Sequence, residues 1–538
     1  PRGFYSWRIL WSVVSSRKLI FPELKKTEKI EKMKHMNSHK RRAGFPLGLA
    51  AACTVFTISC VLWGVSIWFQ RTFQINFQEL LYTLTSPLVG SDTGLVFNCL
   101  KACLPHICLS VLFIALGVIV VTLQKRVAVT LSFQFRGRRR QTDLLSLVRR
   151  AMSVVSIAAL CLSLRSLYVN LRIEEYVQLR RNSTTLYEDH YVDPAGVAIT
   201  PPQEKKNLIY IYLESMETSY ASTDVGGLQP EHNYMPNLTA MAREALSFSN
   251  SEQLGGFHTC HGATWTMGAI FASTSGLPFS FPVGANSMAQ HSVFAAGCTV
   301  MGDILAENGY RNIFLCGSDA DFAGRKTYYE QHGNYEVYDL FTAREEGYIP
   351  EDYKVWWGYE DIILYQIAKD KLTALAQSGQ PFNFNMLTVD THHVDGYICP
   401  LCGDDYNSVT GNVVSCADRQ IAEFIQWCSQ QDFYKDSVIV IIGDHPRMDS
   451  SLVEGLDYYD RTVYNCFINC DAPDDVRLVN REFTTVDLFP TVLSAMGFQI
   501  EGDQLGFGVD LFSGRDTLSE VMGFHVLDEE FGKYSPYI

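Results

Sequence analysis

Charged residues are scarce in this sequence, and it contains no internal repeat and no low-complexity tract. Asp, Glu, Lys and Arg make up 19% of the 538 residues, hydrophobic residues make up 47%, and mean hydropathy is near zero. Disordered chains combine low hydrophobicity with high net charge. The composition therefore excludes a disordered protein and a nucleic-acid-binding tail, and we expect no nucleic-acid partner. The length predicts roughly two to four modules rather than one ordinary domain.

Acidic residues are nearly absent from the first third of the chain and abundant in the rest. Residues 1–170 contain 23 Lys and Arg but only 6 Asp and Glu, a net charge of +17. Residues 171–538 contain 21 Lys and Arg and 52 Asp and Glu, a net charge of −31. One soluble globule would not divide its charge in this way. The division predicts a membrane anchor followed by a water-exposed domain, and a lipid bilayer as a partner.

Three apolar runs lie within the basic third. Gly44–Phe69 and Cys103–Leu123 carry no charge, and each is long enough to cross a hydrocarbon core of about 30 Å. The third run, Leu144–Val169, is interrupted by three arginines, so its core is Ala151–Leu164; the alternative is a buried or interfacial helix. A single cleaved signal peptide does not explain three such runs.

Basic residues predict the orientation of these spans. They cluster before the first run and between the second and third, whereas residues 70–102 contain only Arg71 and Lys101. Because Lys and Arg are retained on the cytoplasmic side, we expect residues 171–538 outside the cytoplasm. The expected parts are a cytoplasmic segment (1–43), an anchor of about three transmembrane helices (44–170), a helical linker (171–206) and an extracytoplasmic domain (207–538).

Cysteines are numerous, but their spacing does not complete a metal motif. Nine of the 15 lie in the outer domain, so at least one of these is unpaired or pairs with another chain. Cys399-Pro-Leu-Cys402 resembles half a zinc knuckle, yet a structural zinc ion usually has four ligands. No second C-x-x-C occurs, although Cys466 and Cys470 are close in sequence. Local disulfides or plain thiols are therefore favoured over zinc.

The outer domain alternates apolar runs with amphipathic stretches. Continuous apolar runs, rather than alternating ones, indicate strands that are buried on both faces. The pattern predicts an α/β layered domain with a central, largely parallel sheet. The expected strands are residues 208–213, 312–316, 382–389, 437–442 and 464–468, and the expected helices include 235–245, 361–375 and 417–428.

Polar side chains follow three of these expected strands. Glu214 follows the first, Asp390-Thr391-His392-His393 follow the third, and Asp444-His445 follow the fourth. Sites in open α/β sheets form outside the carboxyl ends of the strands. A polar residue after one strand is usually a turn residue, but three such groups together favour a site. Carboxylate and imidazole donors suit one divalent ion, with Mn²⁺ expected first and Zn²⁺ or Mg²⁺ as alternatives.

A nucleophile is expected near residues 255–272, where glycines lead into a helix of small residues. Thr264 and Thr266 lie near the amino end of that helix. A hydroxyl there meets free backbone N–H groups and the positive end of the helix dipole, which together favour a phosphate. A metal ion on the same hydroxyl would lower its pKa. The alternative is that either threonine only caps the helix.

These motifs occur in an order that resembles the lipoteichoic acid synthase and phosphoglycerol transferase family of the alkaline-phosphatase and sulfatase superfamily. The resemblance covers residues 205–515. It implies one extracytoplasmic α/β domain on a short bundle of spans in a bacterial cell membrane; the synthases usually have five spans, against three counted here. The motifs are Leu213–Glu217, Gly262–Ala272 with Gly276-Leu277-Pro278, Trp357–Asp361, Asp390–His393 and Gly443–His445.

The resemblance also implies roles for individual residues. Glu214, Asp444 and His445 match metal ligands, and Thr266 matches the catalytic threonine, which also contacts the metal. Thr264 is its competitor, because the spacing to the following Leu-Pro differs slightly from that of the synthases. His392, near the transferred phosphate and the leaving oxygen, is expected to be both catalytic and substrate-binding. The other expected substrate-binding residues are Arg325 and Trp357.

The expected activity is a metal-dependent phosphotransferase. Phosphoglycerol would pass from phosphatidylglycerol, through a covalent intermediate on Thr266, to a hydroxyl of a glycan, lipid or envelope polymer. Alternatives on the same fold are hydrolysis by a sulfatase or phosphatase, phosphoethanolamine transfer, and a non-catalytic receptor. Formylglycine sulfatases need a C/S-x-P-x-R run, which this sequence lacks, and a receptor would be expected to lose a ligand.

Overall fold

The computed structural model describes residues 47–72, 94–124, 130–135, 138–171, 173–174, 177, 183–280, 288, 293–533 and 535. The chain forms two compact units. One consists of Pro1–Gln70 and Val96–Leu171, and the other of Arg71–Leu95 and Arg172–Ile538. The segment 1–43, for which a cytoplasmic location is predicted, lies outside the described residues.

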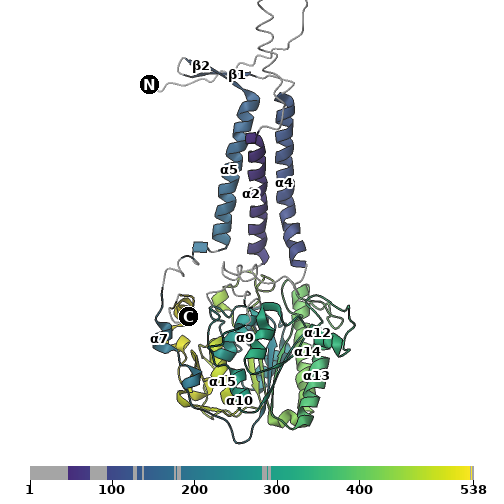
Figure 1. The fold of residues 1–538 in the computed structure, drawn as a ribbon, viewed down its shortest axis with the longest axis vertical. Helices are drawn as coiled ribbons and strands as arrows, with labels where there is room; N and C mark the ends of the chain where they lie inside the picture. The colour runs from purple at the N-terminus through teal and green to yellow at the C-terminus, as the bar shows by residue number, and fades with distance from the viewer. Residues whose placement is uncertain are drawn as a thin grey trace, which may run out of the picture. The chain divides into compact units, whose positions relative to one another are not determined.

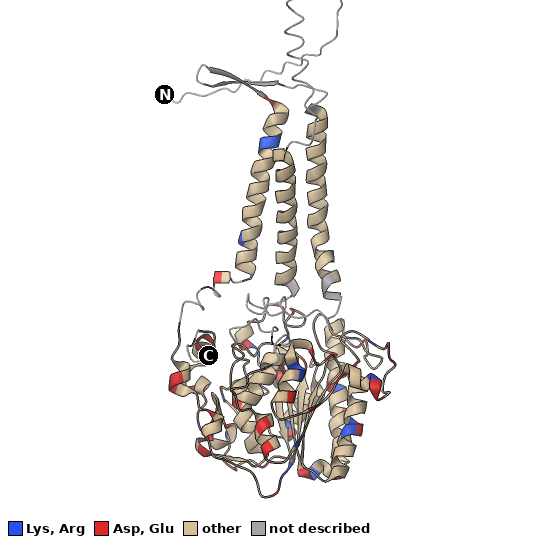
Figure 2. Cartoon of the chain, in the orientation of Figure 1, with Lys and Arg blue, Asp and Glu red and all other residues tan. Residues whose placement is uncertain are grey.

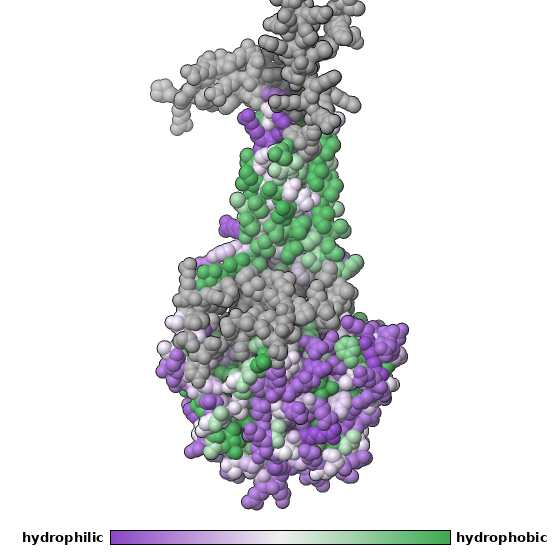
Figure 3. Space-filling view, viewed as in Figure 1, coloured by the Kyte–Doolittle hydropathy of each residue, from purple (hydrophilic) through white to green (hydrophobic). Residues whose placement is uncertain are grey.

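The first unit contains three helices that are long and apolar enough to cross a membrane. They are α2 (Leu47–Thr72), α4 (Gly94–Gln124) and α5 (Leu144–Asn170), and a hairpin of β1 (Thr130–Phe135) and β2 (Arg138–Asp143) precedes α5 (Figure 1). Figure 2 shows almost no charge along these helices, and Figure 3 shows apolar residues covering their surface. The third apolar run, which basic residues interrupt, is therefore one continuous helix.

Small polar side chains join α2 to α5. The Ser156 hydroxyl donates to the Ala52 carbonyl at 2.8 Å, the Ser66 and Ser166 hydroxyls lie 2.9 Å apart, and Asn170 Nδ2 donates to Ser66 Oγ at 2.8 Å. Lipid tails are as apolar as leucine, so close packing and hydrogen bonds, rather than the hydrophobic effect, hold helices together in a bilayer. These contacts fix the two helices against one another.

The second unit is built on a six-stranded sheet with the order β6-β5-β7-β4-β8-β9. The first five strands in this order run parallel, and β9 is antiparallel to β8. The predicted α/β domain with a central, largely parallel sheet is confirmed. The strands are β4 (Asn207–Leu213), β5 (Arg311–Cys316), β6 (Glu336–Tyr338), β7 (Phe382–Leu387), β8 (Ser437–Gly443) and β9 (Asn465–Ile468).

Helices cover both faces of this sheet. Leu208 and Tyr210 of β4 enter one apolar core, whereas Ile209 and Ile211 enter the other, which explains why the strands are continuously apolar. The first core includes residues of α9 (Thr266–Ser275), α10 (Met301–Glu307), α11 (Arg325–Gln331), α15 (Leu488–Ala495), α16 (Leu518–Met522) and α17 (Phe524–Phe531); the second includes residues of α8 (Pro236–Glu244), α12 (Leu340–Glu345), α13 (Asp361–Ser378) and α14 (Val409–Ser429).

Strand register brings distant parts of the chain to one edge of the sheet. Leu213 at the end of β4 pairs with Gly443 at the end of β8, and Tyr212 pairs with Leu387 at the end of β7. Because these strands are parallel, the residues that follow them emerge at the same edge. The groups predicted to form a site therefore start within one to three residues of this edge.

Two features differ from the sequence predictions. The edge strand β6 was not expected, because three residues are too few to show a period. In addition, β3 (Ile199–Thr200), within the segment 171–206 for which a helical linker stays a prediction, pairs with β10 (Gln499–Ile500), and the same segment contains the single-turn helix α7 (Leu186–His190). Such pairing across about three hundred residues leaves no local signal in composition.

Truncation of a core strand tests this account of the fold. Ile441 is fully buried in β8, so Ile441→Ala should lower the free energy of unfolding by about 2–5 kcal/mol. Ile398→Ala removes the same atoms from a side chain that is 56% exposed and should change stability by about 0.5 kcal/mol or less. Urea denaturation of the detergent-solubilised protein measures both, and equal losses would contradict the burial pattern.

Candidate metal centre

Two buried carboxylates lie side by side at the carboxyl edge of the sheet. Glu214 follows β4, Asp444 follows β8, and their side chains are almost inaccessible to solvent. Backbone N–H groups of Ser215 and His445 donate to Asp444 Oδ1 at 2.7 and 2.8 Å, and the Ser215 hydroxyl donates to Glu214 Oε1 at 2.7 Å. Ser215 adopts φ 52°, a strained backbone that directs both of its donors to this pair.

His445 completes the cluster. Its Nε2 atom lies 3.4 Å from Asp444 Oδ2 and 3.7 Å from Glu214 Oε1. Its other ring nitrogen, Nδ1, lies 2.9 Å from the Pro446 carbonyl, which can accept a hydrogen bond only from a protonated Nδ1. In the neutral ring this leaves the lone pair of Nε2 directed at the carboxylates, the arrangement that metal-binding histidines use.

The three residues fit a divalent ion. Ligand atoms from Glu214, Asp444 and His445 all lie within 4.8 Å of one another. Among the described residues, no hydrogen-bond donor reaches the buried Asp444 Oδ2, and a buried carboxylate oxygen without a partner is costly. Burial and the neighbouring Glu214 charge raise the pKa of Asp444 to about 7. A cation held between these groups would offset both penalties.

Thr266 brings a hydroxyl to the same cluster. It is the first residue of α9, and its Oγ1 lies 3.2 Å from Glu214 Oε2 and 3.5 Å from His445 Nε2. A Cβ at Gly268 would lie 2.2 Å from the Gly262 carbonyl oxygen, so only glycine allows this close packing at the start of the helix. Thr264, the alternative nucleophile, precedes the helix.

His392 lies beside the cluster within an aromatic group. Burial raises the pKa of Glu214, but the nearby His392 and His445 imidazoles and the hydrogen bonds from Ser215 and Thr266 outweigh burial, so the pKa is lowered. The His392 ring centroid is 4.6 Å from that of Trp357 and 5.9 Å from that of Trp356. Trp357 therefore lies next to His392, and the substrate-binding role of both residues stays a prediction.

Arg325 is the first residue of α11, and its described contacts are with the segment that precedes this helix. Its Nη2 donates to Ser318 Oγ at 3.0 Å and to the Asp319 carbonyl at 2.8 Å. Its guanidinium lies 5.5 Å from the Phe322 ring, which is 5.6 Å from Trp357. The Phe322 ring thus lies between Arg325 and Trp357, which packs beside His392. The contact of Arg325 with a substrate phosphate stays a prediction.

The sequence analysis missed Arg447. This residue is 1% exposed, forms two hydrogen bonds of 2.8 and 2.9 Å with Asp449, and donates to the Thr391 carbonyl at 2.9 Å. The Thr391 hydroxyl in turn donates to the Glu214 carbonyl. Arg447 thereby connects the loops that follow β8, β7 and β4, and its only signal in the sequence is that it follows His445 by two positions.

Asp390 belongs to one of the predicted motifs but pairs with another aspartate. Asp390 Oδ1 accepts from the Asp361 N–H at 3.2 Å, and Asp361 Oδ1 accepts from the Val389 N–H at 2.8 Å. Burial and the charge of Asp361 raise the pKa of Asp390 to about 10, as expected when two close carboxyl groups retain a proton. This pair anchors the start of the loop that carries His392.

The comparisons with known proteins agree with this architecture. A family model described as Sulfatase matches residues 206–498. This match spans more than half of the chain and includes the whole cluster. The chain belongs to the sulfatase family, which confirms the superfamily expected from the order of the motifs.

Particular relatives carry a more specific name. Phosphoglycerol transferase I of Salmonella choleraesuis (strain SC-B67) is 32% identical over 455 residues, covering 82% of this chain and 53% of the relative. Phosphoglycerol transferase I of Salmonella typhi is 32% identical over 456 residues, with the same coverage. The chain thus spans about half the length of the curated relatives it matches.

Solved structures with a similar fold include a synthase and a transferase. The lipoteichoic acid synthase LtaP of Listeria monocytogenes has a TM-score of 0.45 and 22% identity, covering 59% of this chain and 79% of that one. The lipooligosaccharide phosphoethanolamine transferase A of Neisseria meningitidis has a TM-score of 0.46 and 12% identity, covering 83% of this chain and 84% of that one.

Removal of one ligand tests the metal centre. Asp444→Asn keeps the shape of the side chain but removes its charge, so Mn²⁺ affinity should fall by more than the roughly 10–100-fold typical of outer-shell changes. Isothermal titration with Mn²⁺ measures this, and circular dichroism checks that the fold is retained. Asp457→Asn alters an exposed aspartate and should leave the affinity unchanged. Equal Mn²⁺ affinity in the two variants would exclude Asp444 as a ligand.

Proposed function

We propose that this chain is a membrane-anchored phosphotransferase that moves phosphoglycerol from phosphatidylglycerol to an acceptor hydroxyl. The observation that carries the proposal is the Thr266 hydroxyl at the start of α9, 3.2 Å from Glu214 within a cluster suited to a metal ion. Its position at the start of a buried helix provides backbone N–H groups for the oxygens of a phosphate. The names of the relatives and the apolar helices of the first unit support the choice of donor.

The first half of the reaction forms a covalent intermediate. One divalent ion held by Glu214, Asp444 and His445, with Mn²⁺ expected before Zn²⁺ or Mg²⁺, would supply positive charge that favours ionisation of the neighbouring hydroxyl. Thr266 Oγ1 forms a bond to phosphorus, and the bond from phosphorus to the diacylglycerol oxygen breaks. The proton that the threonine loses is returned to the departing oxygen, so diacylglycerol leaves as a neutral alcohol.

The second half transfers the group. A hydroxyl of a glycan, lipid or envelope polymer attacks phosphorus, the Thr266–phosphorus bond breaks, and the acceptor's proton returns to the threonine oxygen. Burial lowers the pKa of His392, and its Nδ1 lies 2.8 Å from the His393 carbonyl. A neutral ring with its proton on Nδ1 keeps the Nε2 lone pair, which can carry the proton between acceptor and threonine.

Product analysis is the decisive experiment for this function. The purified protein with Mn²⁺ and phosphatidylglycerol labelled in both its glycerol and its acyl chains should release labelled diacylglycerol and retain labelled phosphoglycerol. Release of free glycerol phosphate as the main product, with an acceptor present, would indicate a hydrolase. Turnover of phosphatidylethanolamine but not phosphatidylglycerol would indicate the other transferase.

The two threonines can be separated by substitution. Thr266→Ala removes the attacking oxygen, so turnover should fall by several orders of magnitude, up to the roughly 10⁶-fold loss seen when a nucleophile is deleted. Thr264→Ala should retain most activity and cost at most about 2 kcal/mol of stability. Mass spectrometry of the trapped enzyme should find the phosphoglycerol adduct on Thr266. An adduct on Thr264, or an active Thr266→Ala enzyme, would reverse the assignment.

The location of the catalytic unit is also proposed. The Lys and Arg bias places residues 125–150 in the cytoplasm and residues 171–538 outside it. A cysteine introduced at the exposed Glu454 should react with a membrane-impermeant maleimide on intact bacterial cells or spheroplasts. A cysteine introduced at Arg139 should react only after permeabilisation. Labelling is compared with the unmodified chain, and the reverse pattern would invert the topology.

A further inference from the structure

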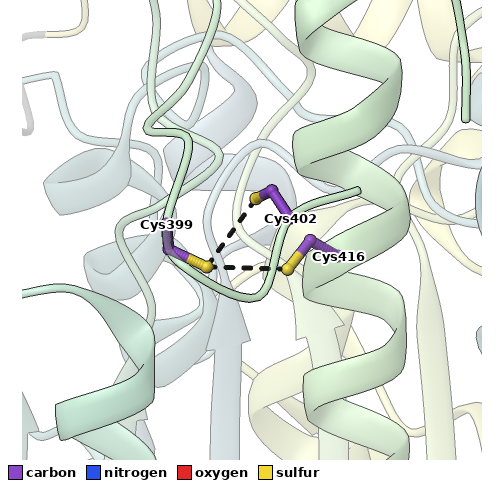
Figure 4. Close-up of side chains that lie close together, drawn as sticks. All are labelled: Cys399, Cys402 and Cys416. Atoms are coloured by element: carbon purple, nitrogen blue, oxygen red, sulfur yellow. Dashed lines mark hydrogen bonds between the residues drawn. The ribbon is translucent and has the colours of Figure 1, made fainter. Parts of the chain in front are cut away.

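Three thiols converge outside the candidate metal centre. Cys399 and Cys402 lie on the loop between β7 and α14, and Cys416 lies on α14. The Cys399 sulfur is 3.7 Å from that of Cys402 and 3.6 Å from that of Cys416, and the three sulfurs all lie within 4.8 Å of one another (Figure 4). Cys416 on α14 is a candidate ligand that the spacing of the cysteines along the sequence did not indicate.

These separations match a metal-centred arrangement. Zinc bonds to cysteine sulfur at about 2.3 Å with tetrahedral geometry, so two ligand sulfurs on one ion lie about 3.8 Å apart. A disulfide needs about 2.05 Å between sulfurs. Cys399 contacts both of the other sulfurs at nearly the same distance, whereas a disulfide would bring it close to only one of them.

The local backbone also keeps Cys399 and Cys402 close together. The Cys402 N–H donates to the Cys399 carbonyl at 3.0 Å, which closes a tight turn.

Gln420 offers a fourth donor. It follows Cys416 by one helical turn, is 5% exposed, and its Nε2 lies 3.5 Å from the Cys416 sulfur and 3.9 Å from the Cys399 sulfur. Its amide oxygen, Oε1, has no hydrogen-bond partner among the described residues. Rotating the terminal amide group of Gln420 by half a revolution exchanges Nε2 and Oε1. The unsatisfied Oε1 then points at the three sulfurs.

We propose that Cys399, Cys402 and Cys416 bind a structural Zn²⁺ ion, with the Gln420 amide oxygen in the fourth position. Three thiolates select a soft or borderline ion, whereas the carboxylate and imidazole cluster at Glu214 suits a harder one. The two sites therefore hold ions of different chemistry, and the thiolate site does not depend on the proposed phosphotransfer.

The zinc ion would fasten the His392 loop to the helix layer. The same loop leaves β7, carries His392, and is held near its start by the Tyr397 N–H, which donates to the Asp390 carbonyl at 2.7 Å. Cys399 and Cys402 follow directly, and Cys416 projects from the second turn of α14. Fixing the far end of the loop restricts the positions that His392 can take.

Cobalt substitution distinguishes this site from the carboxylate cluster. The whole protein is purified without added metal, its zinc content is measured, and the zinc is exchanged for Co²⁺. Thiolate ligands give an intense sulfur-to-cobalt charge-transfer band in the near ultraviolet, which carboxylate and imidazole ligands do not. Wild type should contain zinc and show this band, and Cys416→Ala should lose the band together with the zinc bound at the thiolate site.

Matched variants complete the test. Cys428→Ala removes another buried thiol from α14 and should keep the zinc and the band. Cys402→Ala alters a partly exposed loop residue and should weaken the band even if Cys416→Ala fails to fold. Gln420→Ala should keep the band but release zinc to a chelator faster, and an unchanged rate would remove Gln420 from the ligand set.

Two results would overturn the proposal. One is a wild-type protein without zinc whose peptides containing these cysteines are lighter by two hydrogen atoms under non-reducing conditions, since that mass identifies a disulfide. The other is a protein that holds iron or copper in place of zinc. Retention of zinc and of the cobalt band by Cys416→Ala would equally exclude the assigned ligands.

Discussion

The burial of Glu214 and Asp444 side by side is the constraint on which the second unit depends. Two carboxylates removed from water repel each other and lose hydration, and both effects are costly in a protein interior. Backbone N–H groups and the Ser215 hydroxyl offset part of this cost. The oxygen of Asp444 that no described donor reaches is the place where a cation contributes most. Although the whole domain is strongly acidic, the Glu214 and Asp444 pair is therefore the place where a positive charge stabilises it most.

Buried ion pairs around the cluster hold it in shape. Arg461 lies against Glu217 with contacts of 2.6 and 2.7 Å, and both side chains are almost fully buried. Arg447, bound to Asp449, reaches the carbonyl of Thr391 on the neighbouring loop. Breaking a buried pair leaves an uncompensated charge and typically costs about 3–5 kcal/mol. These arginines are therefore positioned to support the three loops of the site rather than to touch a substrate.

The loop after β7 joins two sites of different chemistry. Its first residues carry His392 to the carboxylate cluster, and its later residues carry Cys399 and Cys402 to α14. A covalent transfer reaction needs its proton carrier within a narrow range of positions, and loops are the least constrained parts of a fold. A metal ion at the far end would give this long loop the rigidity that its irregular backbone lacks. The proposed membrane location adds a second requirement, because the donor lipid must reach a fixed site.

The sequence by itself determined the layered α/β class, the three apolar helices and the identity of the residues that cluster at Glu214, since these follow from local hydrophobic patterns and from the ends of buried strands. It could not show the pairing of β3 with β10, the Arg447 bridge, or the approach of Cys416 to the C-x-x-C turn. Only the tertiary structure decided these, because each joins residues that are separated along the chain and leave no periodic signal. Strand register is the physical reason that Glu214 and Asp444 meet, and helix packing is the reason that a third thiol meets the other two.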